Sequence, residues 1–282
     1  MNRLHLGNSE ITHLCGGRFR LDGGAMFGVV PKALWDPVAP ADQHNRVALS
    51  CNCLLLRNAA GLTLIDTGLG TRFSEREQAI FAIDKQAVLT AALSQAGYQP
   101  EDVDRLILTH LHFDHCGGAL ETTPQGLQAA FPRADYLVQR GEWNDARQGK
   151  SIMKSSYRPD DLQTLERSGR LRLIDGDTDL GQGLSTFVTG GHTAHHQGVI
   201  IRDGGQILAY PGELVPTRAH LRLYWNMAYD MDPYTTFQGK AAWLEEACRG
   251  DWIIAYDHDP ETPWSRLQKN ANQYLARPLG EQ

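Results

Sequence analysis

The chain has 282 residues, enough to bury a substantial hydrophobic core in one large α/β domain or two small ones. Its 41% hydrophobic and 21% charged residues are typical of a globular protein, which excludes a largely disordered or fibrous chain. The 33 acidic and 27 basic residues give a formal net charge of -6, so the chain offers no general electrostatic attraction to nucleic acid or to an anionic membrane surface.

The first 14 residues, MNRLHLGNSEITHL, contain neither the long apolar core nor the small-residue cleavage site of a secretory signal. No later run is long and apolar enough to span a bilayer. We therefore expect a cytoplasmic protein with no membrane partner. The cysteines are odd in number and sparse, which argues against a disulfide framework. They are Cys15, Cys51, Cys53, Cys116 and Cys248, and the alternation of Cys51 and Cys53 indicates half-buried strand positions.

Strand and helix signals alternate along the chain, as in a layered α/β domain. The apolar runs Val47–Leu56 and Leu62–Ile65 predict a hairpin. Asp84 is placed to cap a helix that runs to about Ala96, and Arg105–Leu108 predicts a short buried strand. Neither a low-complexity linker nor a repeat divides the chain, so we predict one domain over residues 1–282, with 1–46 as an N-terminal extension.

Further strands are predicted in the second half of the chain, separated by glycines and acidic turns. A helix begins at Asp232-Pro233, with proline at its first position, and ends before Gly250. Trp252–Tyr256 is predicted to be the last strand. The other predicted strands are Tyr136–Val138, Leu171–Ile174, Leu184–Val188, Gly198–Ile201 and Gln206–Ala209.

A dense group of histidines and an aspartate follows the strand at Arg105–Leu108. In an extended segment His110 and His112 point to one side, so they can share a metal ion. Asp114 and His115 follow next to Gly117-Gly118, where the chain can turn and offer them to a second, adjacent position. An isolated histidine is usually a surface or hydrogen-bonded residue, but this cluster predicts two divalent ions, zinc first, with iron or manganese as alternatives.

The segment His110-Leu-His112-Phe-Asp114-His115 resembles the His-x-His-x-Asp-His motif of the metallo-β-lactamase superfamily. The resemblance covers about Val47 to His258 and implies a four-layer αββα sandwich. It implies that His192 joins His110 and His112, and that His258 joins Asp114 and His115. It also implies that Asp66 supports the metal loop without binding an ion.

Two positions depart from the family pattern. Where the family usually has a bridging aspartate, this chain has Glu213, whose carboxylate either bridges the ions or belongs to a turn residue that binds neither. The chain also has two histidines, His195 and His196, where the family usually has one. We expect His196 to support the metal ligands and His195 to be structural.

A divalent ion lowers the pKa of bound water from about 15.7 toward about 7, which supplies a metal-bound hydroxide for hydrolysis. Asp114 is the catalytic candidate because it can accept a proton or orient that hydroxide. By elimination within the family, we expect a dinuclear hydrolase acting on a small ester- or lactone-like substrate. Phosphotriesterase or thioesterase activity, or a non-catalytic metal-binding module, remain the alternatives.

The N-terminal segment contains apolar residues that we expect to contact this substrate. Family members with lactonase-like activity have a similar loop that lines the substrate cavity, and Met26, Phe27 and Trp35 are the residues concerned here. The alternative is that these residues are core or dimer contacts. A small molecule is thus the expected partner, nucleic acid is not, and a homodimer is left open.

Overall fold

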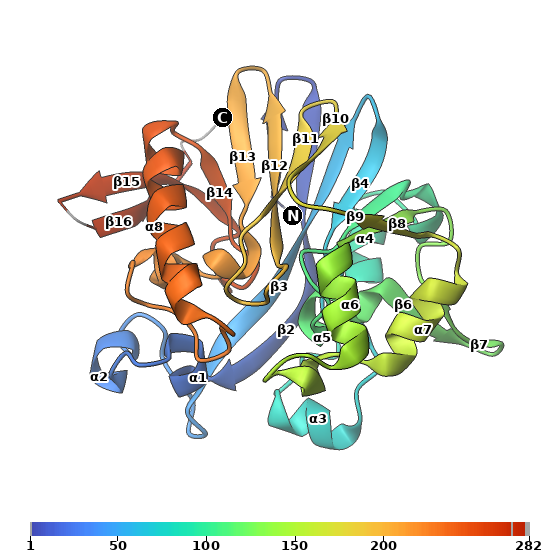
Figure 1. The fold of residues 1–282 in the computed structure, drawn as a ribbon, viewed down its shortest axis with the longest axis horizontal. Coiled ribbons are helices and arrows are strands. Elements are labelled where there is room, and N and C mark those ends of the chain that lie inside the picture. Colours follow the sequence, from blue (N-terminus) through green and yellow to red (C-terminus); the bar gives the residue numbers. More distant parts are fainter. Residues whose placement is uncertain (1, 272, 280–282) are drawn as a thin grey trace.

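The computed structural model describes residues 2–271 and 273–279, and within them most strands belong to two seven-stranded sheets (Figure 1). The first sheet contains, in spatial order, β1 (Arg3–Leu6), β2 (Ser9–Asp22), β3 (Arg46–Asn58), β4 (Gly61–Ile65), β5 (Arg105–Ile107), β8 (Asp135–Gln139) and β9 (Leu171–Ile174). The second contains β10 (Thr178–Gly181), β11 (Leu184–Val188), β12 (Gln197–Asp203), β13 (Gln206–Tyr210), β14 (Ile253–Ala255), β15 (Trp264–Asn270) and β16 (Gln273–Arg277). A small ribbon is formed by β6 (Leu120–Thr123) and β7 (Gly126–Ala129).

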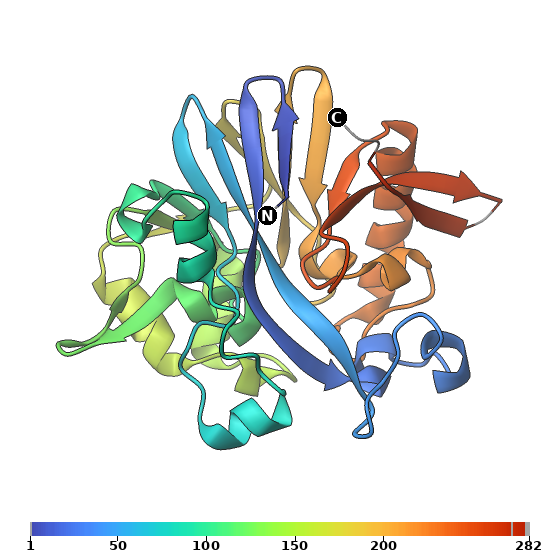
Figure 2. The ribbon, with the colours of Figure 1, turned by 180° about the vertical axis from the view of Figure 1, so that it is seen from behind.

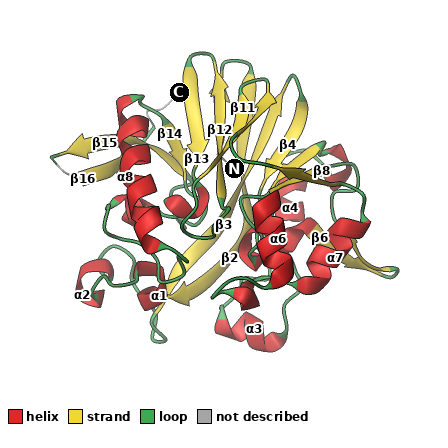
Figure 3. Cartoon of the chain, viewed as in Figure 1, coloured by secondary structure: helices red, strands yellow, loops and turns green. Residues whose placement is uncertain are grey.

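The helices lie outside the two sheets (Figure 3). The first sheet is covered by α4 (Leu89–Gln95), α6 (Arg140–Gln148) and α7 (Pro159–Arg167), and the second by α8 (Pro233–Arg249). Short helices lie near the ends of β2 and β4 and inside the histidine motif: α1 (Gly23–Phe27), α2 (Lys32–Trp35), α3 (Glu75–Ile80) and α5 (Phe113–Cys116).

The side chains of β3 show why the molecule has four layers. Leu54 and Leu56 pack between the sheets against residues of β12 and β13. Leu55 lies on the other face and packs against the helices, together with Leu93 of α4. A strand buried on both faces reads as a continuous apolar run, as this one does. A third cluster joins the second sheet to α8, for example through Leu244. The predicted four-layer αββα sandwich is therefore confirmed.

The hairpin predicted from the two apolar runs is confirmed as β3 and β4, and α8 has Asp232 as its N-cap, as predicted. The helix predicted from Asp84 is wrong at its start, because α4 begins only at Leu89. The Asp84 carboxylate instead accepts a hydrogen bond from the backbone N–H of Gln86 in a preceding turn. The strand at 252–256 is also not the last one, because β15 and β16 follow it.

Residues 3–6 and 9–22 of the predicted N-terminal extension form β1 and β2 of the first sheet. β2 pairs with β3 along almost its whole length, as Figure 2 shows from behind. The register shifts between Cys15 and Arg18, where two glycines interrupt the strand pattern. A Cβ on Gly16 would lie 2.7 Å from Cys53 Sγ, so glycine is required for this close approach. One domain over residues 1–282 stays a prediction.

All five cysteines are free, and both Cys51 and Cys53 are buried, because β3 is covered on both faces. They had been expected to be only half-buried. Within the part of the chain that the structure describes, none of the helices has the length and apolar character needed to cross a membrane.

Candidate metal centre

The loops that carry the predicted ligands leave the two sheets at one edge. In the first sheet β4 and β5 are parallel, so the loops after them, with Asp66 and His110, lie side by side. In the second sheet β13 and β14 are parallel, and the loops after them carry Glu213 and His258. Because the carboxyl ends of parallel strands share an edge, residues far apart in the sequence meet here.

The first group of ligand-type side chains contains His110, His112 and His192, all buried. His112 Nδ1 lies 3.1 Å from His192 Nε2, while the Nδ1 atom of His192 lies 3.2 Å from a carboxylate oxygen of Asp230. Burial and the neighbouring histidines hold the pKa of His110 and of His112 well below the usual range. The Nε2 atom of His110 is buried without a hydrogen-bond partner. The rings of His110 and His112 are therefore neutral and free to coordinate an ion, whereas burial is outweighed at His192 by Glu213 and Asp230, which raise its pKa.

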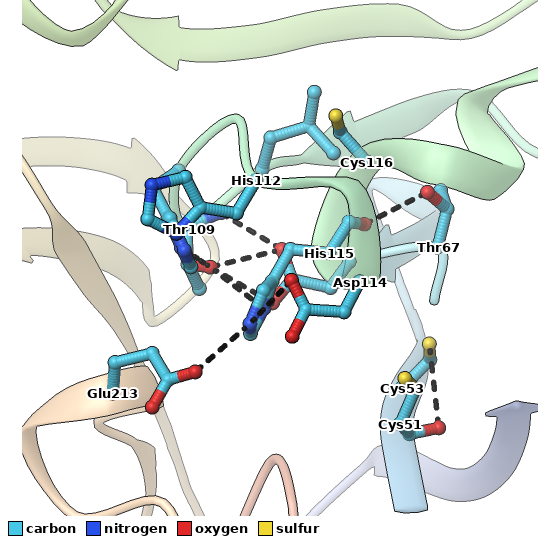
Figure 4. Close-up of polar contacts among 12 residues, drawn as sticks. Cys51, Cys53, Thr67, Thr109, His112, Asp114, His115, Cys116 and Glu213 are labelled. Atoms are coloured by element: carbon cyan, nitrogen blue, oxygen red, sulfur yellow. Dashed lines mark hydrogen bonds and ion pairs between the residues drawn. The ribbon is translucent and has the colours of Figure 1, made fainter. Parts of the chain in front are cut away.

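The second group contains Asp114, His115, Glu213 and His258, also buried. Glu213 Oε1 lies 2.8 Å from His258 Nε2 and 3.3 Å from His115 Nε2. Figure 4 shows Asp114 and His115 on the α5 turn, with Glu213 facing them from the other side. The side chain of Glu213 thus points into the site, and its Oε2 atom is buried without a partner.

Hydrogen bonds on the far side of these rings fix which nitrogen atoms carry protons. His115 Nδ1 lies 2.9 Å from Asp66 Oδ2, and His258 Nδ1 lies 2.9 Å from the Ser50 carbonyl oxygen. Both oxygens only accept, so both Nδ1 atoms donate. In neutral rings the two Nε2 atoms then present lone pairs, only 3.2 Å apart and beside Glu213. A proton or a metal ion between them removes the repulsion of these groups, and the set of two imidazoles and two carboxylates fits a metal ion.

The electrostatics of the second group agree with this geometry. Burial lowers the pKa of His115, but the carboxylates of Asp114, Asp66 and Glu213 outweigh it and raise that pKa well above its usual range. A positive charge is therefore strongly favoured at this position.

Asp66 lies next to the histidine motif and belongs to neither group. Its carboxylate accepts hydrogen bonds from the backbone N–H and the hydroxyl of Thr109, at 2.8 and 2.9 Å, and from the Tyr210 hydroxyl at 3.2 Å. Together with its contact to His115 Nδ1, these bonds fix the ring of His115 relative to the start of the motif.

The neighbouring His195 and His196 differ in burial and in their contacts. His196 Nε2 accepts a hydrogen bond from the backbone N–H of Glu213 at 3.2 Å, so its protonated Nδ1 faces the Thr189 hydroxyl. This contact fixes the turn that presents Glu213. His195 lies outside both groups, with 44% of its side chain exposed, 3.7 Å from a carboxylate oxygen of Asp145.

Glu142 is a buried carboxylate beside the candidate centre that the sequence analysis missed. Its carboxylate is fully buried and accepts hydrogen bonds from the Leu111 backbone N–H at 3.1 Å, the Tyr157 hydroxyl at 3.1 Å and the Thr193 hydroxyl at 2.6 Å. It therefore ties the loop of the first two histidines to the loop that carries His192. Asp230, which contacts His192, was missed in the same way, because no local pattern marks either residue.

A cavity of about 280 Å³ opens beside both groups. His112, Asp114, His192 and Glu213 line one end of it. The rest is largely apolar: Leu21, Met26, Phe73, Ile80, Phe81, Phe113, Met153, Met227 and Tyr229. A larger cavity of about 610 Å³ lies elsewhere and includes none of the predicted metal ligands, so the smaller one is the candidate substrate site.

Of the three apolar residues expected to contact substrate, only Met26 lines the 280 Å³ cavity. Phe27 lines the larger cavity instead and stacks on Trp35, with ring centroids 5.2 Å apart. Trp35 is 1% exposed and packs against Gly23 in a hydrophobic cluster. The structure thus places Phe27 and Trp35 in the core behind the cavity wall, and we keep only Met26 as a proposed substrate contact.

Lys240 of α8 is buried close to this site and gives a testable pH dependence. Its ammonium donates to the Trp225 carbonyl oxygen at 2.7 Å, and burial lowers the pKa of Lys240 to about 7. Between pH 7 and pH 10 the unfolded chain then binds a proton that the folded chain does not, so the free energy of unfolding should rise with pH, by at most about 1.4 kcal/mol per pH unit.

The variant Lys240→Met should remove this rise, because the titrating group is gone. Urea denaturation of both proteins between pH 7 and pH 10 measures the two slopes, and Lys85→Met, at an exposed position, is the control. Identical slopes in wild type and Lys240→Met would contradict the assignment.

Comparison with known proteins decides the family. The family model of the metallo-beta-lactamase superfamily matches residues 46–258, about three quarters of the chain. The chain belongs to this superfamily. The resemblance seen in the sequence is thereby confirmed, and the matched segment includes both groups of ligand-type residues.

Two relatives found by sequence are 28% and 25% identical to this chain. An N-acyl homoserine lactonase from Bacillus sp is 28% identical over 159 residues, which cover 53% of this chain and 57% of that protein. The chain thus spans little more than half the length of the lactonases that it matches. A probable metallo-hydrolase of Mycobacterium tuberculosis is 25% identical over 291 residues and 90% of each chain.

Solved structures match the whole fold. A probable metal-dependent hydrolase from Staphylococcus aureus superposes with a TM-score of 0.89 at 28% identity, covering 99% of this chain and 100% of that one. AidC, a dizinc quorum-quenching lactonase, superposes with a TM-score of 0.82 over 100% of this chain and 98% of its own. At 20% identity the second match shows a common fold only.

Proposed function

We propose that this protein is a dinuclear metal-dependent hydrolase that acts on a small ester or lactone. The observation that carries the proposal is the pair of adjacent buried groups, one of three histidines and one of two histidines and two carboxylates, at the end of a largely apolar cavity. Lactonases among the relatives and a metal-dependent hydrolase among the structural neighbours support it.

In this proposal each of the two groups of side chains binds one metal ion. His110, His112 and His192 would hold one ion, and Asp114, His115, Glu213 and His258 would hold the other. Divalent ions bound there would supply Lewis acidity and lower the pKa of water to about 7. Zinc suits the mixture of imidazole and carboxylate ligands best.

Two residues that line the cavity have proposed roles in the reaction, one as a proton acceptor and the other as a hydrogen-bond donor. Asp114 lines the cavity and is its catalytic carboxylate, orienting the attacking water and accepting its proton. Tyr229 also lines it, and burial raises the pKa of Tyr229 to about 12, so its hydroxyl stays protonated at neutral pH. That hydroxyl can donate a hydrogen bond to a substrate oxygen on which negative charge develops.

Elemental analysis combined with an activity screen tests the proposal. The purified protein should carry about two equivalents of transition metal, and it should hydrolyse lactones or aryl esters faster than thioesters or phosphotriesters. Chelation should abolish turnover, and added zinc should restore it. Full activity in a metal-free protein would contradict the proposal.

A further inference from the structure

One wall of the 280 Å³ cavity is built from phenylalanine rings. The Phe113 ring centroid lies 5.8 Å from that of Phe73 and 5.2 Å from that of Phe81. Phe113 stands in the sequence between His112 and Asp114, which belong to the two ligand groups. This wall therefore begins directly at the candidate metal centre.

A single guanidinium lies on this aromatic wall. The central carbon of the Arg158 guanidinium is 4.3 Å from the Phe73 ring centroid and 5.9 Å from that of Phe113. Its Nη1 atom donates to the Arg72 carbonyl oxygen at 2.8 Å. Stacking on a ring and one fixed hydrogen bond hold the plane of the guanidinium in one orientation.

Arg158 forms no ion pair with an acidic side chain among the described residues. Its neighbour Arg72, by contrast, is paired with both carboxylate oxygens of Asp161. Glu77 lines the same cavity, and its Oε2 atom accepts from the backbone and hydroxyl of Ser74, at 2.7 Å each. These hydrogen bonds, with a smaller contribution from the charge of Arg158, lower the pKa of Glu77. The Nε and Nη2 atoms of Arg158 make no hydrogen bond within the described chain, so one edge of its guanidinium is free.

Helix stability does not explain an arginine at this position. Arg158 is the N-cap of α7, and its side chain makes no capping hydrogen bond. Serine, threonine, aspartate and asparagine are preferred there, and the helix dipole disfavours a cation at this end. The presence of an arginine at position 158 is therefore better explained by its place in the lining of the cavity than by the stability of α7.

We propose that Arg158 binds a carboxylate on the substrate, so that the enzyme prefers esters or lactones with a carboxylate remote from the scissile bond. This inference rests on the proposed function. The Nε and Nη2 edge matches the two oxygens of a carboxylate in a bidentate pair. A carboxylate fits better than a doubly charged phosphate, because Glu77, which is not one of the proposed metal ligands, also lines the cavity and repels the higher charge more strongly.

A pair of aryl esters of equal chain length tests this specificity, one ending in a carboxylate and the other in a methyl group. In the zinc-loaded full chain, Arg158→Gln should lower the ratio of kcat/KM values, carboxylate ester over neutral ester, by about 10- to 100-fold, mainly through KM. Arg158→Lys should fall in between, since it keeps the charge but loses the fork. Lys154→Gln removes an exposed charge from the same loop and should leave the ratio unchanged.

Calorimetry of the matching dicarboxylic acid and methyl-terminated monoacid gives a second readout that needs no turnover. Arg158→Gln should weaken binding of the diacid at least tenfold more than binding of the monoacid. An equal loss for both ligands, or for both esters, would mean that Arg158 only holds the wall in place and would overturn the proposal. If wild type hydrolyses neither ester but the binding difference persists, the proposed function fails while the role of Arg158 stands.

Discussion

Asp114→Ala should reduce the turnover of the best ester or lactone substrate by at least about 100-fold and leave roughly one equivalent of metal. The Oδ2 atom of Asp114 lies 3.6 Å from His258 Nε2, so its loss removes a ligand from the second group only. His110→Ala should reduce turnover similarly, but by weakening the first group. Metal titration of both variants beside steady-state kinetics separates the two effects.

The exposed acidic position Glu101 provides a control, since Glu101→Ala should change neither quantity. Circular dichroism should show the same secondary structure in all variants, because the sheets are held by hydrophobic clusters away from the ligand loops. Near wild-type turnover in both ligand variants would refute catalysis at this centre.

Glu213→Ala should lose metal mainly from the second group and lower turnover by a comparable factor. The Glu213 carboxylate lies between His115 Nε2 and His258 Nε2, and without it these two nitrogen atoms lose their shared partner. Glu213→Asp should keep both ions and measurable hydrolysis, with weaker affinity. The aspartate side chain is shorter, and the backbone cannot move far enough toward the ions to make up the difference. His196 and the positive φ of Gly212 fix the turn that carries residue 213.

Zinc titration of both Glu213 variants, with rates on the same substrate, measures this difference. Unchanged stoichiometry, affinity and rate in the alanine variant would show that Glu213 is a turn residue only. Loss of both ions in the aspartate variant would show instead that the length of the side chain is as important as its charge.

The histidine motif was predictable because its ligands are close in sequence, and the apolar runs of β3 and β4 were predictable because burial on both sides leaves few polar residues. Glu142 and Asp230 were not predictable, since their roles depend on contacts across 31 and 38 residues that have no local signature. Trp35 shows the converse. Its aromatic character suggested a binding wall, but only packing against Gly23 and Phe27 decides that it is core.

Within the described residues, the chain passes from the first sheet to the second once, between Ile174 and Thr178. Each ligand group nevertheless draws on both halves: the first combines His110 and His112 with His192, and the second combines Asp114 and His115 with Glu213 and His258. Neither group is complete until both halves have folded and docked. Ions bound there would fasten the two halves together, and their binding free energy would count toward the free energy of unfolding. During folding, the two sheets would then form first, and the metal ions would bind last, between the two halves of the chain.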